Sequence, residues 1–560
     1  MTGPMAASTI SGRPSAGEIA RATAAAIPSE VSTRPLLGIL GVVTGAGLVT
    51  LAGRMLSLGL GDLKGHVGIS LDDGAWLDSA YNASLMFIGP FTVYLGGLLG
   101  PRRILLFAAG VFTLTSIVLP GIHSYSLLII ALILAGLTSG TFYPLTLTFA
   151  LRNIPLRYLP FTIAFYAVFV DGAVNVAPSL YGWYRDHLSW HWMFWNSALI
   201  APVMMVCIYF GIPATPRREK NAPAPSFVGF FYLSAGLALI FAALQQGQRL
   251  DWWRSGEFNA WFWSGFFFLV CALVRRLHGP NSFVALPYLL KWNTILLGCL
   301  LFWFRFTLCT TIILVPQSLA IRGFEIDQIG PAIIWIAVPL IPVAFTAALL
   351  LLRKFDPRLL FAIGLACTAF AAWLNSQYSS TWAAESFYRT ELLTGVGQSF
   401  AFIGLVGCVV LQAIFAGALA KPEWVLTFAA FLHTIRIFGG TAGALYMGHF
   451  VAQREKLHSN LLGLHVASGN WITDQNIQAL TAGMYAKTSG MAAAGARAIG
   501  LVAARLRLQA YSLSLGDGFL LISWSCVCAL ILVALLRRPP LTYGDLSEMQ
   551  EIPAVEKESK

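Results

Sequence analysis

An aspartate and a proline interrupt a run of residues that is otherwise apolar and aromatic. The stretch "YAVFVDGAVNVAPSLYGWY" (residues 166–184) contains Asp171 and then Pro178, and it is long enough to cross a membrane. An unpaired carboxylate is costly in hydrocarbon, so we expect Asp171 to face a water-filled cavity, to pair with a base, or to be protonated. Arg54 is the basic residue that we expect to pair with Asp171, and a purely structural ion pair is the alternative interpretation.

Few other ionisable residues fall within or near the apolar runs. Asp78 joins Asp171 and Arg54 as a candidate for proton coupling, although it lies at the start of its run, where an interfacial position is the alternative. In the second half of the chain the polar candidates are Arg305, Glu391, His433 and Arg436. An unperturbed histidine titrates near neutral pH, but a hydrogen-bonded structural histidine is the alternative for His433.

Aromatic rings within two neighbouring runs are candidates to line a cavity for a hydrophobic or aromatic solute. Packing against lipid explains the same rings equally well, so both interpretations stay open at this point. The residues concerned are Phe142, Tyr143, Phe165 and Tyr166.

The composition excludes a water-soluble protein. Of the 560 residues, 57% are hydrophobic and only 11% are charged, whereas soluble domains average about 25% charged residues. Apolar stretches of roughly twenty residues recur along the chain, which predicts a polytopic α-helical membrane protein. An outer-membrane barrel would show alternating strands of about ten residues instead. The net charge of +11 lies in short clusters between the apolar stretches, which argues against nucleic-acid binding.

About fourteen transmembrane helices are predicted, in groups of six, two and six. The chain is thus divided into a disordered cytoplasmic tail (1–34), an N-terminal six-helix bundle (35–212), two additional helices with cytoplasmic linkers (213–280), a C-terminal six-helix bundle (281–538) and a cytoplasmic tail (539–560). The predicted spans lie near residues 36–60, 76–98, 103–121, 125–150, 160–182, 190–211, 227–246, 259–277, 293–319, 328–352, 358–374, 390–416, 424–450 and 515–536.

Basic residues concentrate in alternate loops. Because basic loops stay in the cytoplasm, both termini are predicted to be cytoplasmic in an inner (cytoplasmic) membrane. The loop at 451–514 is predicted to lie outside, and its stretch from residue 476 to 514 is predicted to form a helix on the membrane surface. The basic clusters that set the orientation include Arg102 and Arg103, Arg152 and Arg157, Arg217 and Arg218, Arg275 and Arg276, Arg353 and Lys354, and Arg537 and Arg538.

Four local sequences resemble the fourteen-span drug:proton antiporters of the major facilitator superfamily, the EmrB/QacA type. They are "LAGLTSGTFYPLTLTFALRNIP" (134–155), "APSLYGWYRDHLSWHWMFWN" (177–196), "LQQGQRLDWWRSGEF" (244–258) and "FLHTIRIFGGTAGALYMGHFVAQREKLH" (431–458). The resemblance implies two six-helix bundles that rock around a midplane site. It also implies an antiporter motif in the fifth span (Gly172, Ala177, Pro178 and Gly182) and a cytoplasmic gate after the second span.

The sequence also departs from the pattern of that family. Ala52 stands where the family carries an acid in the first span, and Leu132 and Ala135 stand where it carries an arginine and a glutamine in the fourth. The gate is reduced to "GGLLGPRRI", which retains Gly100, Arg102 and Arg103 but no acid. Three features tied to proton coupling are therefore missing or displaced, so drug:proton antiport does not follow from the resemblance alone.

The sequence predicts a secondary active transporter, not an enzyme, with no cofactor and no metal site. Proton-coupled efflux of amphiphilic small molecules is the first hypothesis, and a narrow-specificity metabolite carrier, with or without proton coupling, is the second. A receptor that binds a ligand without transporting it is a third. The expected partners are the lipid bilayer, a small amphiphilic substrate and protons. In a Gram-negative source, the resemblance also implies a periplasmic adaptor and an outer-membrane channel.

Overall fold

The computed structural model describes residues 34–146, 158–213, 226–278, 289–415, 422–466, 469–487 and 490–548. Within these ranges every regular element is a helix. A chain that crosses hydrocarbon has no water to satisfy its backbone, and a helix satisfies every N–H and C=O group within one segment. Most of the predicted N-terminal tail (1–33), most of the linkers around residues 147–157, 214–225 and 279–288, and residues 549–560 lie outside the described part of the chain.

Fourteen long helices are present in the described ranges. Thirteen are long and apolar enough to cross a membrane, and α3 (Leu71–Leu99) packs among them against α5, α9 and α18. The predicted number of about fourteen spans and the predicted fold class are thereby confirmed. The first half contains α2 (Pro35–Val67), α3, α4 (Pro101–Val118), α5 (Tyr125–Ser139), α7 (Leu159–His187) and α8 (Trp192–Gly211), and the additional pair is α9 (Phe227–Gln246) and α10 (Gly256–His278).

Two spans of the second half are interrupted helices. The first runs from α12 (Trp292–Thr307) through a π-helical turn (Thr310–Leu314) into α13 (Val315–Ala320). The next runs from α14 (Ile326–Ile333) to α15 (Leu340–Leu352), with Pro331 and Pro339 near the break, because proline removes a backbone donor and kinks a helix. The remaining long helices are α16 (Pro357–Asn375), α17 (Ala384–Phe415), α18 (Pro422–Gly463) and α20 (Met491–Ala534).

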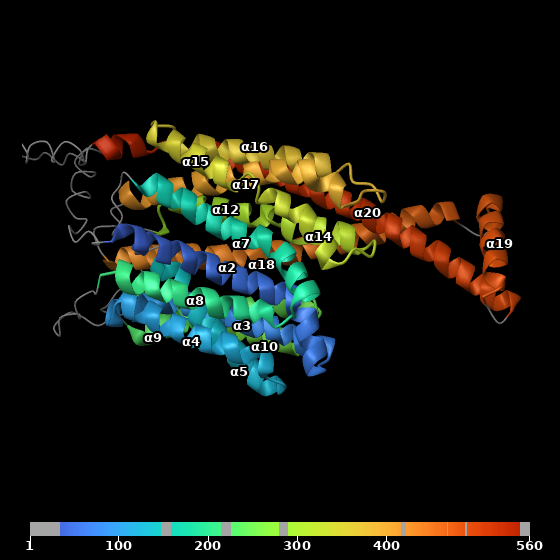
Figure 1. The fold of residues 1–560 in the computed structure, drawn as a ribbon, viewed down its shortest axis with the longest axis horizontal. Helices are drawn as coiled ribbons and strands as arrows, with labels where there is room; N and C mark the ends of the chain where they lie inside the picture. Colours follow the sequence, from blue (N-terminus) through green and yellow to red (C-terminus); the bar gives the residue numbers. More distant parts are fainter. Residues whose placement is uncertain are drawn as a thin grey trace, which may run out of the picture.

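Both described ends of the chain lie at the same end of the bundle, as an even number of spans requires (Figure 1). We call this the proximal end and the opposite one the distal end. Each half has its own hydrophobic core, but α7 is shared between them. Its first twelve residues supply side chains such as Leu159, Ile163 and Val170 to the core of the second half, whereas Ala177 and Tyr181 belong to the core of the first half.

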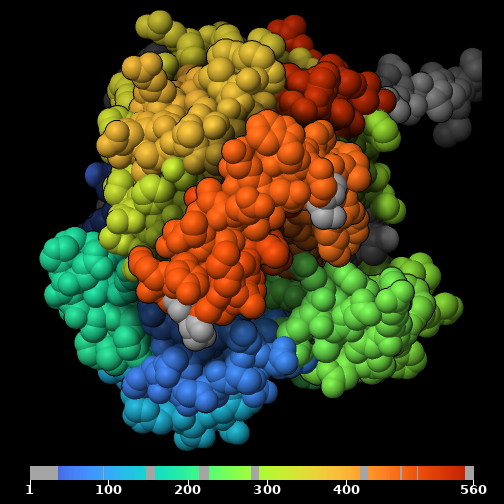
Figure 2. Space-filling model, turned by 90° about the vertical axis from the view of Figure 1, so that its right-hand side faces the viewer, coloured from blue at the N-terminus to red at the C-terminus, as the bar shows by residue number. Residues whose placement is uncertain are grey.

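A helical hairpin projects beyond the distal end of the bundle (Figure 1). It is built from the end of α18, from α19 (Trp471–Tyr485) and from the start of α20, and it lies over the middle of the distal face (Figure 2). The prediction of one membrane-surface helix at 476–514 is therefore wrong, because this stretch is divided between α19 and α20, and residues 491–514 form one continuous helix with the last span. The base of the hairpin is held where Asp517 accepts hydrogen bonds from Arg454 (2.6 Å) and His458 (2.7 Å).

Hydroxyl side chains within the spans mostly bond to their own helix. Thr50 donates to the carbonyl of Ala46 (2.9 Å), Thr92 to that of Ile88 (2.6 Å) and Ser318 to that of Leu314 (2.7 Å). This pattern satisfies a serine or threonine without a partner on another helix. The buried groups that need partners from elsewhere are therefore the carboxylates, guanidiniums, amides and imidazole, and these mark the candidate site.

The backbones of α16 and α17 approach each other through glycines. A β-carbon on Gly364 would lie 2.2 Å from the backbone nitrogen of Ala401, and one on Gly404 would lie 2.3 Å from that of Phe361. Helices in a membrane gain little from burying apolar surface, so close backbone packing at small residues contributes much of their attraction.

We expect Gly364→Ala to destabilise the protein by about 1–3 kcal/mol, because the added methyl group meets backbone that cannot rotate away. The measurement is the thermal unfolding midpoint in detergent. Gly61→Ala in α2 is the matched control, since a β-carbon there meets nothing within 4 Å. Equal midpoints for the two variants would contradict this account of the packing.

Candidate functional site

Asp171 lies on α7 at the interface between the two halves. Its side chain is 3% exposed, and its Oδ2 atom is buried without a hydrogen-bond partner among the described residues. The cation whose charge acts on it is Arg305 of α12, in the second half. Within the described ranges neither Arg54 nor Arg305 forms an ion pair with Asp171, so the predicted pairing with Arg54 is not found, and Nε of Arg54 is buried without a partner.

A cavity of about 30 Å³ lies next to this pair, between the halves. Of the residues that the structure describes, two arginines line it, Arg305 and Arg436, and no acidic residue does so. Tyr143 and Tyr166 come from the first half, and the remaining lining comes from the second half: Leu301, Phe402, Leu405, Val406, Val409, Val410, Phe428 and Leu432.

Arg436 of α18 reaches across the interface to an aromatic ring. Its guanidinium carbon lies 4.3 Å from the centroid of the Tyr143 ring, within the range of a cation–π interaction. Its backbone carbonyl accepts a hydrogen bond from Nε of Arg305 (3.2 Å). The two guanidinium groups are therefore held close together by the second half, and one of them rests on a ring of the first half.

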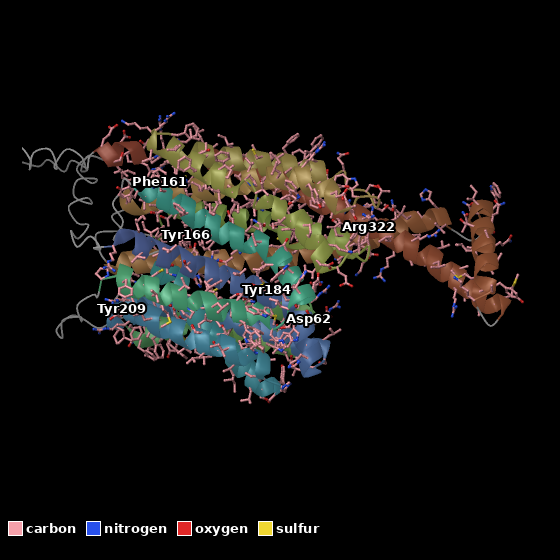
Figure 3. All side chains as sticks on the ribbon, viewed as in Figure 1. Asp62, Phe161, Tyr166, Tyr184, Tyr209 and Arg322 are labelled. Atoms are coloured by element: carbon pink, nitrogen blue, oxygen red, sulfur yellow. The ribbon has the colours of Figure 1, made fainter. Side chains whose placement is uncertain are left out.

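A ladder of aromatic rings continues from this contact into the second half. The centroids of Tyr143 and Tyr166 are 5.8 Å apart, Tyr166 stacks on Phe402 at 6.1 Å, and Phe402 lies 5.8 Å from Phe304. Figure 3 shows Tyr166 on the part of α7 that lies toward the proximal end. The ladder gives the cavity a flat aromatic wall.

Two of the four predicted cavity residues do not line the cavity. Phe142 is fully buried in the core of the first half, where its ring packs against Phe112 at 5.6 Å. Phe165 is 56% exposed on the outside of the bundle. Adjacent residues on a helix point about 100° apart, so each pair of neighbours, Phe142–Tyr143 and Phe165–Tyr166, sends only one ring into the cavity.

His433 and an amide pair form further contacts between the halves. His433 is fully buried, with Nε2 3.4 Å from the carbonyl oxygen of Leu85. Asn175, one turn from Asp171 on α7, donates from Nδ2 to Oε1 of Gln398 on α17 (3.3 Å). The sequence analysis did not single out Gln398, although an amide within an apolar run is the signal that would have identified it.

The antiporter motif packs α7 tightly against α14 of the second half. A β-carbon on Gly182 would lie 2.8 Å from the α-carbon of Asp327, and one on Gly330 would lie 2.6 Å from the α-carbon of Ser179. One turn further, Arg185 forms ion pairs with Glu325 and Asp327. The halves are thus in close contact toward the distal end, with Pro178 inside α7 next to this contact.

An acid in the first span contacts the antiporter helix, although Ala52 stands where the resembled family carries its acid. Tyr181 of α7 donates a hydrogen bond to Asp62 of α2, and Figure 3 shows Asp62 toward the distal end. The predicted first span ended near residue 60, whereas α2 continues to Val67. Asp62 is therefore a candidate functional residue that the sequence analysis missed.

The other two acidic candidates lie apart from the central cavity. Asp78 accepts hydrogen bonds from Asn82 (3.0 Å) and from Gln245 of α9 (2.8 Å), which ties the additional pair to α3. Glu391 is fully buried, and its Oε1 accepts a hydrogen bond from Asn375 (3.0 Å). Neither residue lines the cavity.

The predicted gate residues lie at the proximal end. Gly100 has a φ of 86°, a conformation that favours glycine, and it separates α3 from α4. Arg102 donates to the carbonyl of Tyr209 (2.8 Å), which Figure 3 shows at the proximal end. Arg103 is exposed. Arg102 therefore joins α4 to the end of α8.

A second and larger cavity separates the additional pair from both halves. It has a volume of about 310 Å³ and is almost entirely apolar, with Arg276 as its only charged lining residue. Its lining comes from α3, α9, α10 and α18 together with Leu289. The additional helices therefore pack on the rest of the protein without filling the space between them.

These features define a class of protein. Within the described ranges no group of three His, Cys, Asp or Glu side chains is placed to hold a metal ion. The central cavity is lined by guanidinium groups and aromatic rings, and the buried carboxylate of Asp171 lies at the same interface. An all-helical bundle with such a cavity between two halves is typical of membrane transporters.

The comparisons with known proteins identify the family. The family model of the Major Facilitator Superfamily matches residues 42–444, and the chain belongs to this superfamily. It is similar to the multidrug export protein EmrB of Haemophilus influenzae, with 22% identity over 414 residues that cover 73% of this chain and 79% of the relative. It is also similar to the probable multidrug resistance protein EmrY of Escherichia coli, with 23% identity over 427 residues, 74% of this chain and 80% of the relative.

A solved structure shows the same fold. The proton:xylose symporter XylE superposes with a TM-score of 0.54, at 11% sequence identity, over 92% of this chain and 99% of the other. The matches to EmrB and EmrY confirm the resemblance on which the sequence analysis relied.

We expect Gly182→Ala to separate α7 from α14 toward the distal end, because the added methyl group meets backbone of Asp327. In a cysteine-free background, a cysteine at Ser179 should then react faster with a maleimide in detergent solution. Gly172→Ala on the same helix is the matched control, since a β-carbon there meets only the side chain of Leu340 at 3.7 Å. Equal labelling rates in the two variants would contradict a sealing role for Gly182.

Proposed function

We propose that the protein is a proton-coupled exporter of amphiphilic small molecules that works by alternating access. The observation that carries this proposal is the buried carboxylate of Asp171 at the interface between the halves, 3% exposed and with no hydrogen-bond partner for its Oδ2 among the described residues. Relatives with the printed names multidrug export protein and multidrug resistance protein support export of drug-like molecules. The aromatic wall of the central cavity supports a hydrophobic or aromatic substrate.

Protonation of Asp171 is the coupling step. The ionised carboxylate attracts Arg305 and so favours the arrangement in which the halves are in contact near the cavity. Protonation removes both that attraction and a buried charge. It thereby shifts the equilibrium between the inward-facing and outward-facing conformations of the transporter. Other contacts near the cavity include the hydrogen bond of Asn175 with Gln398 and the apolar packing of α7 against the second half, and both must be broken when the halves separate.

The orientation that we propose puts both termini in the cytoplasm of a cell with the protein in its inner membrane. It rests on the basic loops of the sequence and places the distal end outside. If the source is a Gram-negative bacterium, the hairpin of α18, α19 and α20 is the segment that reaches furthest toward a periplasmic adaptor and an outer-membrane channel (Figure 1).

A dedicated metabolite carrier of the same fold, with or without proton coupling, is the second candidate. It is favoured by Ala52, Leu132 and Ala135, which replace residues that the resembled family uses in coupling. A carrier of this kind would transport one compound and ignore unrelated amphiphiles, so a panel of substrates separates the two candidates.

We expect Asp171→Asn to abolish proton-driven efflux while leaving the protein folded, because asparagine is close to the shape of the protonated acid but cannot lose a proton. The measurement is efflux of fluorescent amphiphiles of either charge from pump-deficient cells, with and without a protonophore. Asp78→Asn at matched membrane levels is the control, and it should retain efflux because Asp78 bonds to α9 away from the cavity. Normal, protonophore-sensitive efflux by Asp171→Asn would refute the assignment.

A further inference from the structure

We propose that the central cavity binds the anionic head group of an amphiphile, with Arg436 as the residue that holds it. The proposal rests on the function proposed above and names its substrate class. The first observation is the balance of charge in the cavity. Among the described residues, two guanidinium groups line it and no acid does so, and Asp171 is the one buried carboxylate on the facing helix α7. One positive charge is therefore left without a counter-charge.

The surroundings of Arg436 indicate that its guanidinium is the group that carries the unpaired positive charge. The side chain is only 7% exposed, and its Nε is buried without a hydrogen-bond partner in the described part of the chain. Its contact with Tyr143 is to the face of a ring, which offers attraction but no hydrogen-bond acceptor. A buried charge with unused donors is costly unless an acceptor occupies the site.

An anion of planar or tetrahedral oxygens matches these donors. Guanidinium is planar, stays charged, and binds carboxylate and phosphate-like groups with parallel hydrogen bonds. The Nε of Arg305 already donates a hydrogen bond to the carbonyl of Arg436. The guanidinium of Arg436 is therefore the one with its Nε–H still available to an anion. A cationic head group in the same place would meet two like charges in a medium that screens them poorly.

At about 30 Å³ the cavity has room for the head group but not for the apolar body of such a molecule, and the surfaces that this body would contact when the halves separate are apolar. Tyr166 and Phe402 form an aromatic wall, which suits a ring attached to the head group. Aliphatic side chains of α17 and α18 complete the lining: Leu405, Val406, Val409, Val410 and Leu432. The preferred ligand is therefore a carboxylate or sulfonate attached to an aromatic or branched hydrophobic group.

A purely structural role for Arg436 is the alternative explanation. In that case its contact with Tyr143 only holds α18 against the first half. A structural arginine affects stability, and it affects the binding of all amphiphiles alike. A ligand-binding arginine affects the binding of anions selectively, so charge selectivity distinguishes the two roles.

The experiment measures binding to the full-length protein in lipid nanodiscs by isothermal titration calorimetry, with empty nanodiscs as the reference for partitioning. The probes share one body and differ in head group: 4-octylbenzoate, 4-octylbenzyl alcohol and 4-octylbenzyltrimethylammonium. We expect wild type to bind the benzoate most tightly. We expect Arg436→Gln to weaken the benzoate roughly 10- to 100-fold, the loss of a hydrogen bond to a charged group, and to leave the alcohol unchanged.

Two further variants complete the design. Arg436→Lys keeps the charge without the planar donors and should restore part of the affinity for the benzoate. Arg505→Gln, at an exposed arginine on the hairpin, is the matched control and should bind all three probes as wild type does. If Arg436→Gln does not fold, the comparison of the three probes on wild type still decides the question.

Equal binding of the anionic and cationic probes by wild type, or tighter binding of the cation, would overturn the proposal. So would an equal loss of all three probes in a folded Arg436→Gln variant. Because binding is measured without a proton gradient, its outcome is separate from that of the efflux experiment. Anion-selective binding without any efflux would refute the exporter and leave the anion site standing.

Discussion

Charged groups buried between the two halves are the constraint on which the rest of this structure depends. A charge in a low-dielectric environment needs a partner, because desolvation costs more than most single contacts return. Here the acid, Asp171, belongs to α7 of the first half, whereas Arg305 and Arg436 belong to α12 and α18 of the second. Any movement that separates the halves therefore changes the surroundings of all three charges at once.

The packing around these charges is arranged so that such a movement is feasible. Within the second half, α16 and α17 touch through glycine backbones, which resists relative motion. Between the halves near the cavity, the contacts include a ring face, an imidazole and a pair of amides, together with the stacking of Tyr166 on Phe402. The antiporter segment is the exception, since Gly182 fits against the backbone of Asp327. The distal contact between α7 and α14 is thus close-fitting, and its glycine allows it to form without a side chain in the way.

The sequence was sufficient to predict the helices, but it was not sufficient to predict which side chains meet. Hydropathy identifies a span because each span must be apolar over about 30 Å, so the number and order of helices were predicted correctly. The partner of Asp171 was not, because Arg305 is distant in the chain and only the packing of α7 against the second half brings it near. Asp62 was missed because a helix continues past its apolar stretch, and hydropathy alone does not mark where a helix ends. The hairpin was misplaced for the same reason, since α20 extends well beyond its membrane-spanning part.

The charges also restrict the order in which a proton and an anion can use the cavity. When Asp171 is protonated, Arg305 loses its counter-charge, so the two guanidinium groups attract an anion more strongly rather than less. Electrostatics alone would therefore favour binding of the proton and the anion at the same time. Exchange of a proton for an anion requires instead that the anion leave before the proton binds. In the alternating-access mechanism that we propose, rocking supplies that release, because it would carry Arg436 away from the ring of Tyr143 and admit water to a charge that was buried. The hydrated arginine holds an anion weakly, and Asp171, on the other half, is then free to take up a proton from the same opening.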